Sequence, residues 1–122
     1  MIEKIARMAF LLDFYGGLLT EKQQQCLDMH YNQDLSLAEI AEIFAVSRQA
    51  VHDILKRAEH LLEDYEHRLG LMQRFMRNRE DLAQVMERLQ SVAGKMTGSG
   101  DAVLRSEVDD IRLLMQKIME QQ

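Results

Sequence analysis

The sequence contains no proline, no tryptophan and only one cysteine, Cys26. Because proline is the residue that most strongly interrupts helices, its absence leaves long helices free to form. A single cysteine excludes a disulfide bond within the chain and gives no sign of an oxidising compartment. No apolar run approaches the roughly 20 residues of a membrane-spanning helix, and residues 1–10 do not have the pattern of a signal peptide. We therefore expect a cytoplasmic protein.

Basic residues are also in short supply. Lys and Arg total 15 against 20 Asp and Glu, which gives a net charge of −5 over 122 residues. Non-specific affinity for nucleic acid comes from neutralised phosphates, so this balance argues against binding by bulk charge alone. The length corresponds to about one ordinary domain with room for a helical extension.

Good helix formers such as Ala, Leu, Glu, Gln and Arg are abundant, and alternating apolar and polar residues are nowhere sustained. The chain is therefore expected to be all-α. Apolar residues at steps of three and four predict a first helix from about residue 2 to residue 15. Thr20 and Ser36 each open a capping-box motif and so begin the second and third helices. Ser47 offers a third cap, and the fourth helix is expected to begin at Arg48.

The second half of the chain predicts a C-terminal helical hairpin or coiled-coil extension. Helical pattern continues from Arg48 to about residue 93, but its apolar register slips between Met76 and Leu82, so we expect a bend near residues 77–79. We divide the chain into a helix-turn-helix domain (1–62), a long helix (63–93), a flexible glycine-containing linker (94–101) and an amphipathic helix (102–122). Because the apolar seams of the last two helices cannot be buried on so small a head, they should pair with each other or with a second copy, and we expect a homodimer.

Residues 36–58 are the most informative segment. Two short capped helices joined by a three-residue turn, Ala45-Val46-Ser47, are typical of a DNA-binding helix-turn-helix. Ala41 is small, as it must be where the second helix crosses close above it. Such turns usually carry glycine at the position of Ala45, and a left-handed alanine there would cost about 1 kcal/mol. The apolar residues expected to lock the two helices together are Ile40, Phe44, Val46, Val51, Ile54 and Leu55.

The same geometry defines the candidate nucleic-acid-binding residues on the exposed face of the fourth helix. These are Ser47, Arg48, Gln49, His52, Lys56 and Arg57. Arg and Gln side chains can form paired hydrogen bonds to guanine or adenine, whereas Lys56 and Arg57 lie further along, where phosphates would be. Asp53 stands beside this face and would repel phosphate, and the segment has no net charge. A unit that binds protein, or that only supports the fold, therefore stays open as an alternative.

No arrangement typical of catalysis or of a closed metal site is found. Cys26 and His30 are four residues apart, like half of a zinc site, but a closed site needs two more ligands and no second pair offers them. Cys26 is therefore expected in the core, and we expect no metal, no cofactor and no enzymatic activity.

Residues 36–63 resemble the helix-turn-helix of region four of bacterial sigma factors, and residues 1–76 resemble the YlxM family. The second resemblance is carried by LLDFYGGLLTEKQ, SLAEIAE and SRQAVHDILKR, although the family usually has tyrosine where this chain has His52. It implies a regulatory or accessory role in co-translational targeting by the signal recognition particle (SRP). The partners that it implies are the SRP RNA, the GTPase Ffh and the receptor FtsY. The alternative is a transcriptional regulator that reads the major groove of DNA as a dimer.

Overall fold

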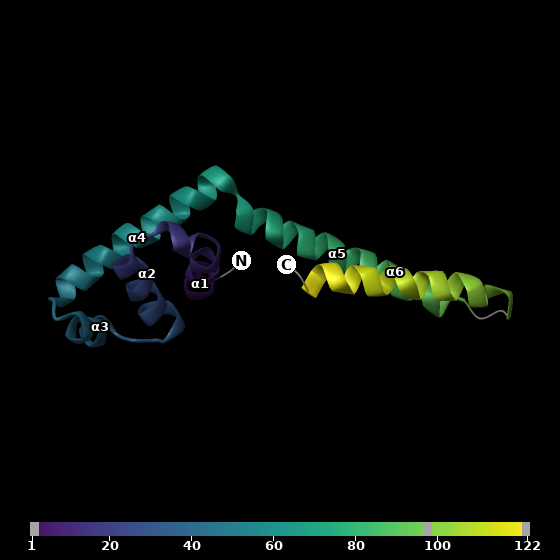
Figure 1. Cartoon of the computed structure of the whole chain (residues 1–122), viewed down its shortest axis with the longest axis horizontal. Coiled ribbons are helices and arrows are strands. Elements are labelled where there is room, and N and C mark those ends of the chain that lie inside the picture. The colour runs from purple at the N-terminus through teal and green to yellow at the C-terminus, as the bar shows by residue number, and fades with distance from the viewer. Residues whose placement is uncertain (1–2, 97–98, 121–122) are drawn as a thin grey trace. The chain divides into compact units, whose positions relative to one another are not determined.

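The computed structural model describes residues 3–96 and 99–120, and no strand occurs among them. Six α-helices follow one another along the chain (Figure 1). Their bounds are α1 Lys4–Tyr15, α2 Glu21–Leu27, α3 Leu37–Phe44, α4 Arg48–Leu69, α5 Leu71–Gly94 and α6 Ala102–Glu120. Short 3₁₀ turns lie at Gly16–Leu18 and Ser99–Asp101, and a wide π-helical turn at Asp28–Asn32 extends α2. The expectation of an all-α protein is confirmed.

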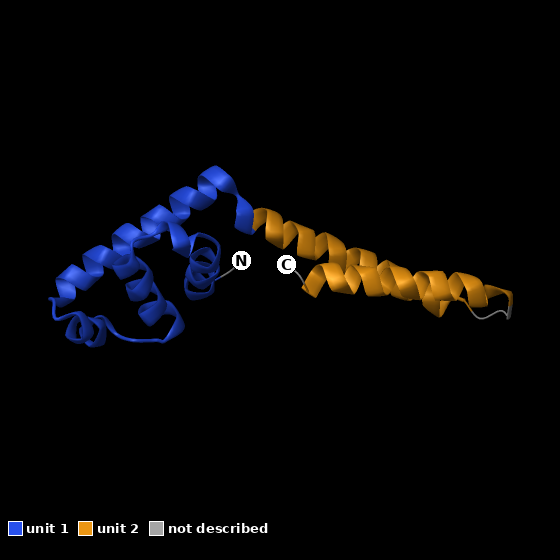
Figure 2. Cartoon of the chain, in the orientation of Figure 1, with its two compact units in different colours: residues 1–72 blue, residues 73–122 orange. Residues whose placement is uncertain are grey.

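The chain divides into two compact units, residues 1–72 and residues 73–122 (Figure 2). In the first unit α4 is the central helix, since α1, α2 and α3 all pack against it. Large side chains from all four helices are fully buried there: Leu11, Tyr15, Leu27, Ile40, Val51 and Leu62. Burial of this apolar surface is the main force that holds the four helices together.

The predicted caps are present with the expected geometry. Thr20 Oγ1 accepts from the Gln23 amide over 3.2 Å, and Gln23 Oε1 accepts from the Thr20 amide over 3.0 Å. Ser36 and Glu39 exchange the same two bonds, each 3.1 Å long. These reciprocal bonds satisfy amides that have no partner within the helix, so α2 and α3 begin where the sequence places them.

Charged side chains join α1 to α4 along one edge of the first unit. Arg7 holds Glu63 with two parallel bonds, from Nε to Oε1 over 2.6 Å and from Nη2 to Oε2 over 2.7 Å. One helical turn earlier on each helix, Lys4 Nζ lies 3.1 Å from Oε1 of the buried carboxylate of Glu59. The hydrogen bonds from Arg7 hold the pKa of the Glu63 carboxyl below its ordinary value. Sequence pattern gave no hint of these pairs, because their members are more than fifty residues apart.

The long helix breaks at a different place from the one expected. The backbone is left-handed at Gly70 (φ 63°), which ends α4 at Leu69, whereas α5 runs through residues 77–79 without interruption. Glycine adopts this conformation at little cost, so the break falls there. The slip of apolar register has another cause. Met72 is buried in the first unit, whereas Leu82 and its successors belong to the second. The boundary between units accordingly follows Met72 rather than residue 62.

The second unit is an antiparallel hairpin of α5 and α6, as the apolar seams predict. Arg79 Nη1 donates to the carbonyl of Met119 over 3.0 Å, and Arg105 Nη2 donates to the carbonyl of Ala93 over 3.0 Å. These two bonds join residues at opposite ends of the hairpin. Of the expected linker, residues 94–96 and 99–101 are described, whereas residues 97–98 lie outside the described part. So do residues 121–122 of the expected last helix.

Candidate nucleic-acid interface

The turn between α3 and α4 has the geometry that its sequence predicts. Ala45 ends α3 in the left-handed conformation, with φ 55° and ψ 46°. Two residues later Ser47 caps α4, and its Oγ accepts from the Ala50 amide over 3.0 Å. The Val46 amide donates to the carbonyl of Ala41 over 3.0 Å, which ties the turn back onto α3. An alanine in this conformation carries the steric cost expected from the sequence.

The apolar lock beneath the turn is formed chiefly by three of the six predicted residues. Ile40, Val51 and Leu55 are buried, and so is the small Ala41 beneath the crossing of the helices. The other three, Phe44, Val46 and Ile54, are half-buried. Packing of this kind fixes the rotation of α4 about its own axis, so the polar residues between the buried ones point outward.

All six predicted site residues are exposed. Ser47, Arg48, Gln49 and His52 line one shallow hollow together with Ser36, Leu37 and Ala38 at the start of α3. Helical spacing places Lys56 near the same side of α4, two turns beyond Arg48, but turns Arg57 about half a revolution away from Arg48. We call Arg48, Gln49, His52 and Lys56 the recognition face. Arg57 does not share it.

Sequence reasoning missed the contribution of α3 to this hollow. Ser36 was recognised only as a cap, although the hollow that receives Arg48 and His52 is also lined by Ser36, Leu37 and Ala38. The available signal was the pair of N-caps at Ser36 and Ser47, since two helix starts that lie close together both present unpaired amides and partial positive charge.

Most of the recognition face is held by neighbours on the same helix. Gln49 Nε2 donates to Asp53 Oδ1 over 3.0 Å, and His52 Nδ1 lies 3.7 Å from the same oxygen. Lys56 Nζ lies 3.8 Å from Oε1 of Glu59. The contacts of Gln49 and His52 with Asp53 are exposed and contribute little stability, so they can be exchanged for contacts to a ligand at small cost. The contact of Lys56 differs, because its partner Glu59 is buried.

Arg48 differs from the rest of the face. Among residues 3–96 and 99–120, no hydrogen bond or ion pair engages its guanidinium group. It stands at the first position of α4, where the helix dipole adds about half a positive charge to that of the side chain. The unpaired positive charge of Arg48 therefore lies at the end of α4 that contacts base edges when a recognition helix enters the major groove.

The other candidate residues take structural places. Cys26 is buried, as expected, and burial raises the pKa of its thiol. His30 Nδ1 lies 2.9 Å from the carbonyl oxygen of Leu35, so this ring stabilises the loop before α3. Within the described ranges, His, Cys, Asp and Glu residues do not gather in any group of three that could hold a metal ion. Nor does any described helix have the length and apolar character needed to cross a bilayer.

Two capped helices, a left-handed turn and an exposed polar face on the second helix define a helix-turn-helix protein. The chain belongs to UPF0122, a family whose model is described as "Putative helix-turn-helix protein, YlxM / p13 like" and matches residues 2–99. This confirms the resemblance to the YlxM family that the sequence motifs indicate.

Curated relatives agree with this assignment. A UPF0122 protein of Halalkalibacterium halodurans is 51% identical over 87 residues, which are 71% of this chain and 80% of that protein. One from Geobacillus kaustophilus is 43% identical over 113 residues, or 91% of this chain and 99% of that protein. A third, from Bacillus mycoides, is 49% identical over 89 residues, which cover 73% of this chain and 81% of the relative.

Proposed function

We propose that this protein is a cytoplasmic regulatory or accessory factor of SRP-dependent co-translational targeting, and that it binds nucleic acid through the recognition face. The observation that carries the nucleic-acid part is the unpaired Arg48 at the exposed start of α4. The role in targeting rests on what the resemblance to the YlxM family implies, whereas the family match itself supports a helix-turn-helix protein. In this proposal the RNA of the particle is the ligand of the recognition face, and the proteins Ffh and FtsY are the partners that the bound protein influences.

The second candidate function is a transcriptional regulator that reads duplex DNA as a dimer. It is favoured by one feature, the position of Arg48 and Gln49 on the first turn of α4. Residues at that position contact base edges when a recognition helix lies in the major groove, and both side chain types can form paired hydrogen bonds to bases. Asp53 opposes both functions, because its carboxylate lies beside the phosphates in either complex.

The two functions are separated by direct binding with fluorescently labelled SRP RNA and with a pool of labelled duplex DNA. The targeting proposal expects saturable binding to the RNA that exceeds binding to duplex DNA at the same salt concentration. The hypothesis of a transcriptional regulator predicts that the protein selects particular duplexes from the pool and that its affinity falls steeply as the salt concentration rises. Failure to bind either probe would overturn a nucleic-acid function for this face.

Arg48→Ala tests the face itself, with Arg68→Ala as its matched control. Both substitutions remove an arginine from α4, but Arg68 lies at the far end and pairs with Asp64 over 3.3 Å. Loss of Arg48 should reduce affinity for the bound probe by about fivefold to 150-fold, corresponding to about 1–3 kcal/mol at a base contact. Arg68→Ala should change affinity by less than about twofold, as expected for an exposed pair. Equal effects of the two changes would contradict the assignment of the recognition face.

A further inference from the structure

Exposed apolar side chains form two stripes on the hairpin of α5 and α6. On α6, Leu104, Ile111 and Ile118 are seven residues apart, with 52%, 44% and 44% of their surfaces exposed. On α5, Val85 and Val92 are also seven residues apart and similarly exposed. Seven residues make nearly two helical turns, so each set lies along one side of its helix.

Both stripes lie on the same face of the hairpin. On α5, the side turned toward α6 is marked by Met86 and Ala93, and on α6 the inward side is marked by Val108 and Met119. Around the axis of each helix, the stripe lies about a quarter turn from these inward residues. The direction of this turn is the same on both helices when each is viewed from its N-terminus. Because the two helices run in opposite directions, equal rotations bring the stripes to one common face. We call it the apolar face.

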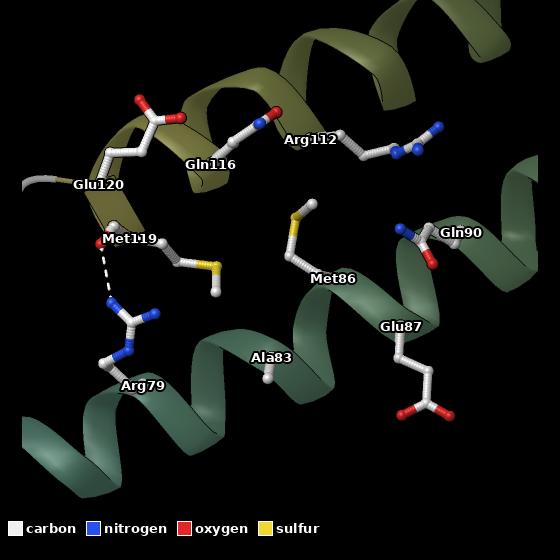
Figure 3. A pocket seen from close by; sticks show the side chains of 9 residues that line it. All are labelled: Arg79, Ala83, Met86, Glu87, Gln90, Arg112, Gln116, Met119 and Glu120. Atoms are coloured by element: carbon white, nitrogen blue, oxygen red, sulfur yellow. Dashed lines mark hydrogen bonds between the residues drawn. The ribbon is translucent and has the colours of Figure 1, made fainter.

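The opposite face of the hairpin is polar and hollowed. A groove runs between the helices there, with Met86 and Met119 pointing into it (Figure 3). Its other lining side chains are mainly charged or amide-bearing: Arg79, Glu87, Gln90, Arg112, Gln116 and Glu120. The hairpin therefore has one side suited to water and one side that leaves apolar surface in contact with it.

We propose that a second copy of this chain covers the apolar face and that two hairpins form a four-helix bundle. Burial of the two stripes and their apolar neighbours removes roughly 600–800 Å² from each copy, which is the size of a standard stable interface. The spacing of seven residues is also the repeat by which helices of a bundle interlock. A pair of helices alone has no further layer on which to bury these side chains.

The charges at the edges of the apolar face match a second copy with antiparallel orientation. Asp81 and Arg88 flank the stripe of α5, and Asp110 and Lys117 flank that of α6; all four are exposed. No ion pair engages them in the part of the chain that the structure describes. Each helix thus carries an acid and, seven residues later, a base. When the same helix of two copies runs antiparallel, each acid faces a base of the other copy.

The test is the molar mass of the full-length protein, measured by sedimentation velocity and light scattering across the micromolar range. The proposal expects twice the mass of one chain. Ile111→Asp and Leu114→Asp place a charge on the apolar face and should weaken dimerisation at least tenfold. The matched control is Leu113→Asp, because Leu113 is 65% exposed against 62% for Leu114 but lies 100° around α6, toward the grooved side. This change should leave the dimer intact.

Helix content measured by circular dichroism accompanies each variant. If Ile111→Asp unfolds the hairpin, the Leu114→Asp variant tests the proposal in its place. Leu114 is more exposed than Ile111, so its replacement removes less packing within the hairpin. A wild-type protein that stays monomeric throughout the range would overturn the proposal. So would a dimer that Leu114→Asp and Leu113→Asp weaken equally. Neither outcome changes which residues form the recognition face, which lies in the other unit. A monomeric protein would, however, also count against the second candidate function, because that function requires a dimer.

Discussion

The hydroxyl group of Tyr15 donates a hydrogen bond to Oε1 of Glu66 over 2.7 Å, and so joins the end of α1 to the last turn of α4. The same hydroxyl oxygen accepts from the Leu71 amide over 3.0 Å, and Glu66 Oε1 accepts from the Met72 amide over 3.0 Å. Leu71 and Met72 open α5, so their amides have no partner within that helix. Tyr15 and Glu66, which are 51 residues apart, therefore act together as the N-terminal cap of α5.

Tyr15→Phe should lower the free energy of unfolding of the first unit by about 1–2 kcal/mol, because it leaves the Leu71 amide without its partner and Glu66 without one donor. Urea denaturation followed by circular dichroism measures this change. Tyr65→Phe is the control. The Tyr65 ring lies 6.0 Å from that of Tyr15, but its hydroxyl makes no hydrogen bond among the described residues. An equal loss in the control would show that the Tyr15 hydroxyl does not act as a cap.

Gly70→Ala should destabilise the protein by about 1 kcal/mol, because φ is 63° and an L-residue is strained there. The cost comes from the backbone conformation, since no atom beyond the adjoining residues of the chain lies within 4 Å of the added Cβ. Gly94→Ala makes the same change at the end of α5, where φ is not positive and the Cβ site is equally open. It should be neutral or stabilising. Thermal denaturation of both variants checks the difference in sign.

Ala45→Gly should stabilise the helix-turn-helix by about 0.5–1 kcal/mol, since glycine adopts the left-handed conformation of this turn without a Cβ clash. Ala38→Gly, at an exposed position within α3, should destabilise by about 1 kcal/mol. Chemical denaturation compares the two variants. A loss of stability in both would mean that Ala45 is not strained.

The free energy of unfolding should fall in acid partly through Glu63. Hydrogen bonds from Arg7 lower the pKa of this carboxyl in the folded state. A lowered folded pKa contributes stability above the unfolded value of about 4.3, and this contribution is lost as pH falls through the folded value. Arg7→Met should flatten this part of the pH profile, which urea denaturation between neutral and acidic pH measures. Arg68→Met, at an exposed pair, should leave the pH profile unchanged. If the free energy of unfolding falls with pH equally in both variants, the effect does not come from the pair of Arg7 and Glu63.

Local signals in the sequence were sufficient for most of the secondary structure. Thr20, Ser36 and Ser47 satisfy amides within three residues of themselves, so their caps can be recognised without knowledge of the fold. The seams of α5 and α6 follow helical spacing, which is also local. The break at Gly70 was missed because an isolated glycine is compatible with a helix. The contacts of Tyr15 and Glu66 with the start of α5 stabilise the break, and helical spacing in the sequence does not reveal them.

The candidate site was predictable as a set of exposed residues, although its function stays a prediction. The turn and the buried Val51 fix which side of α4 faces outward, and both can be recognised from the sequence alone. The sequence does not reveal that Gln49 is held by Asp53 or Lys56 by Glu59, nor that α3 lines the hollow. These depend on side chain conformations and on the crossing of two helices.

By itself, the sequence determined the helical class, the start of each capped helix and the polar outer side of α4, because caps and helical periodicity act over a few residues. Only the tertiary structure decided where the long helix ends, how Arg7 reaches Glu63, and that Arg48, unlike Lys56, has no ionic partner among the described residues. These features join residues far apart in the chain. Their energies depend on distance and burial in space, and no local pattern of residues encodes those quantities.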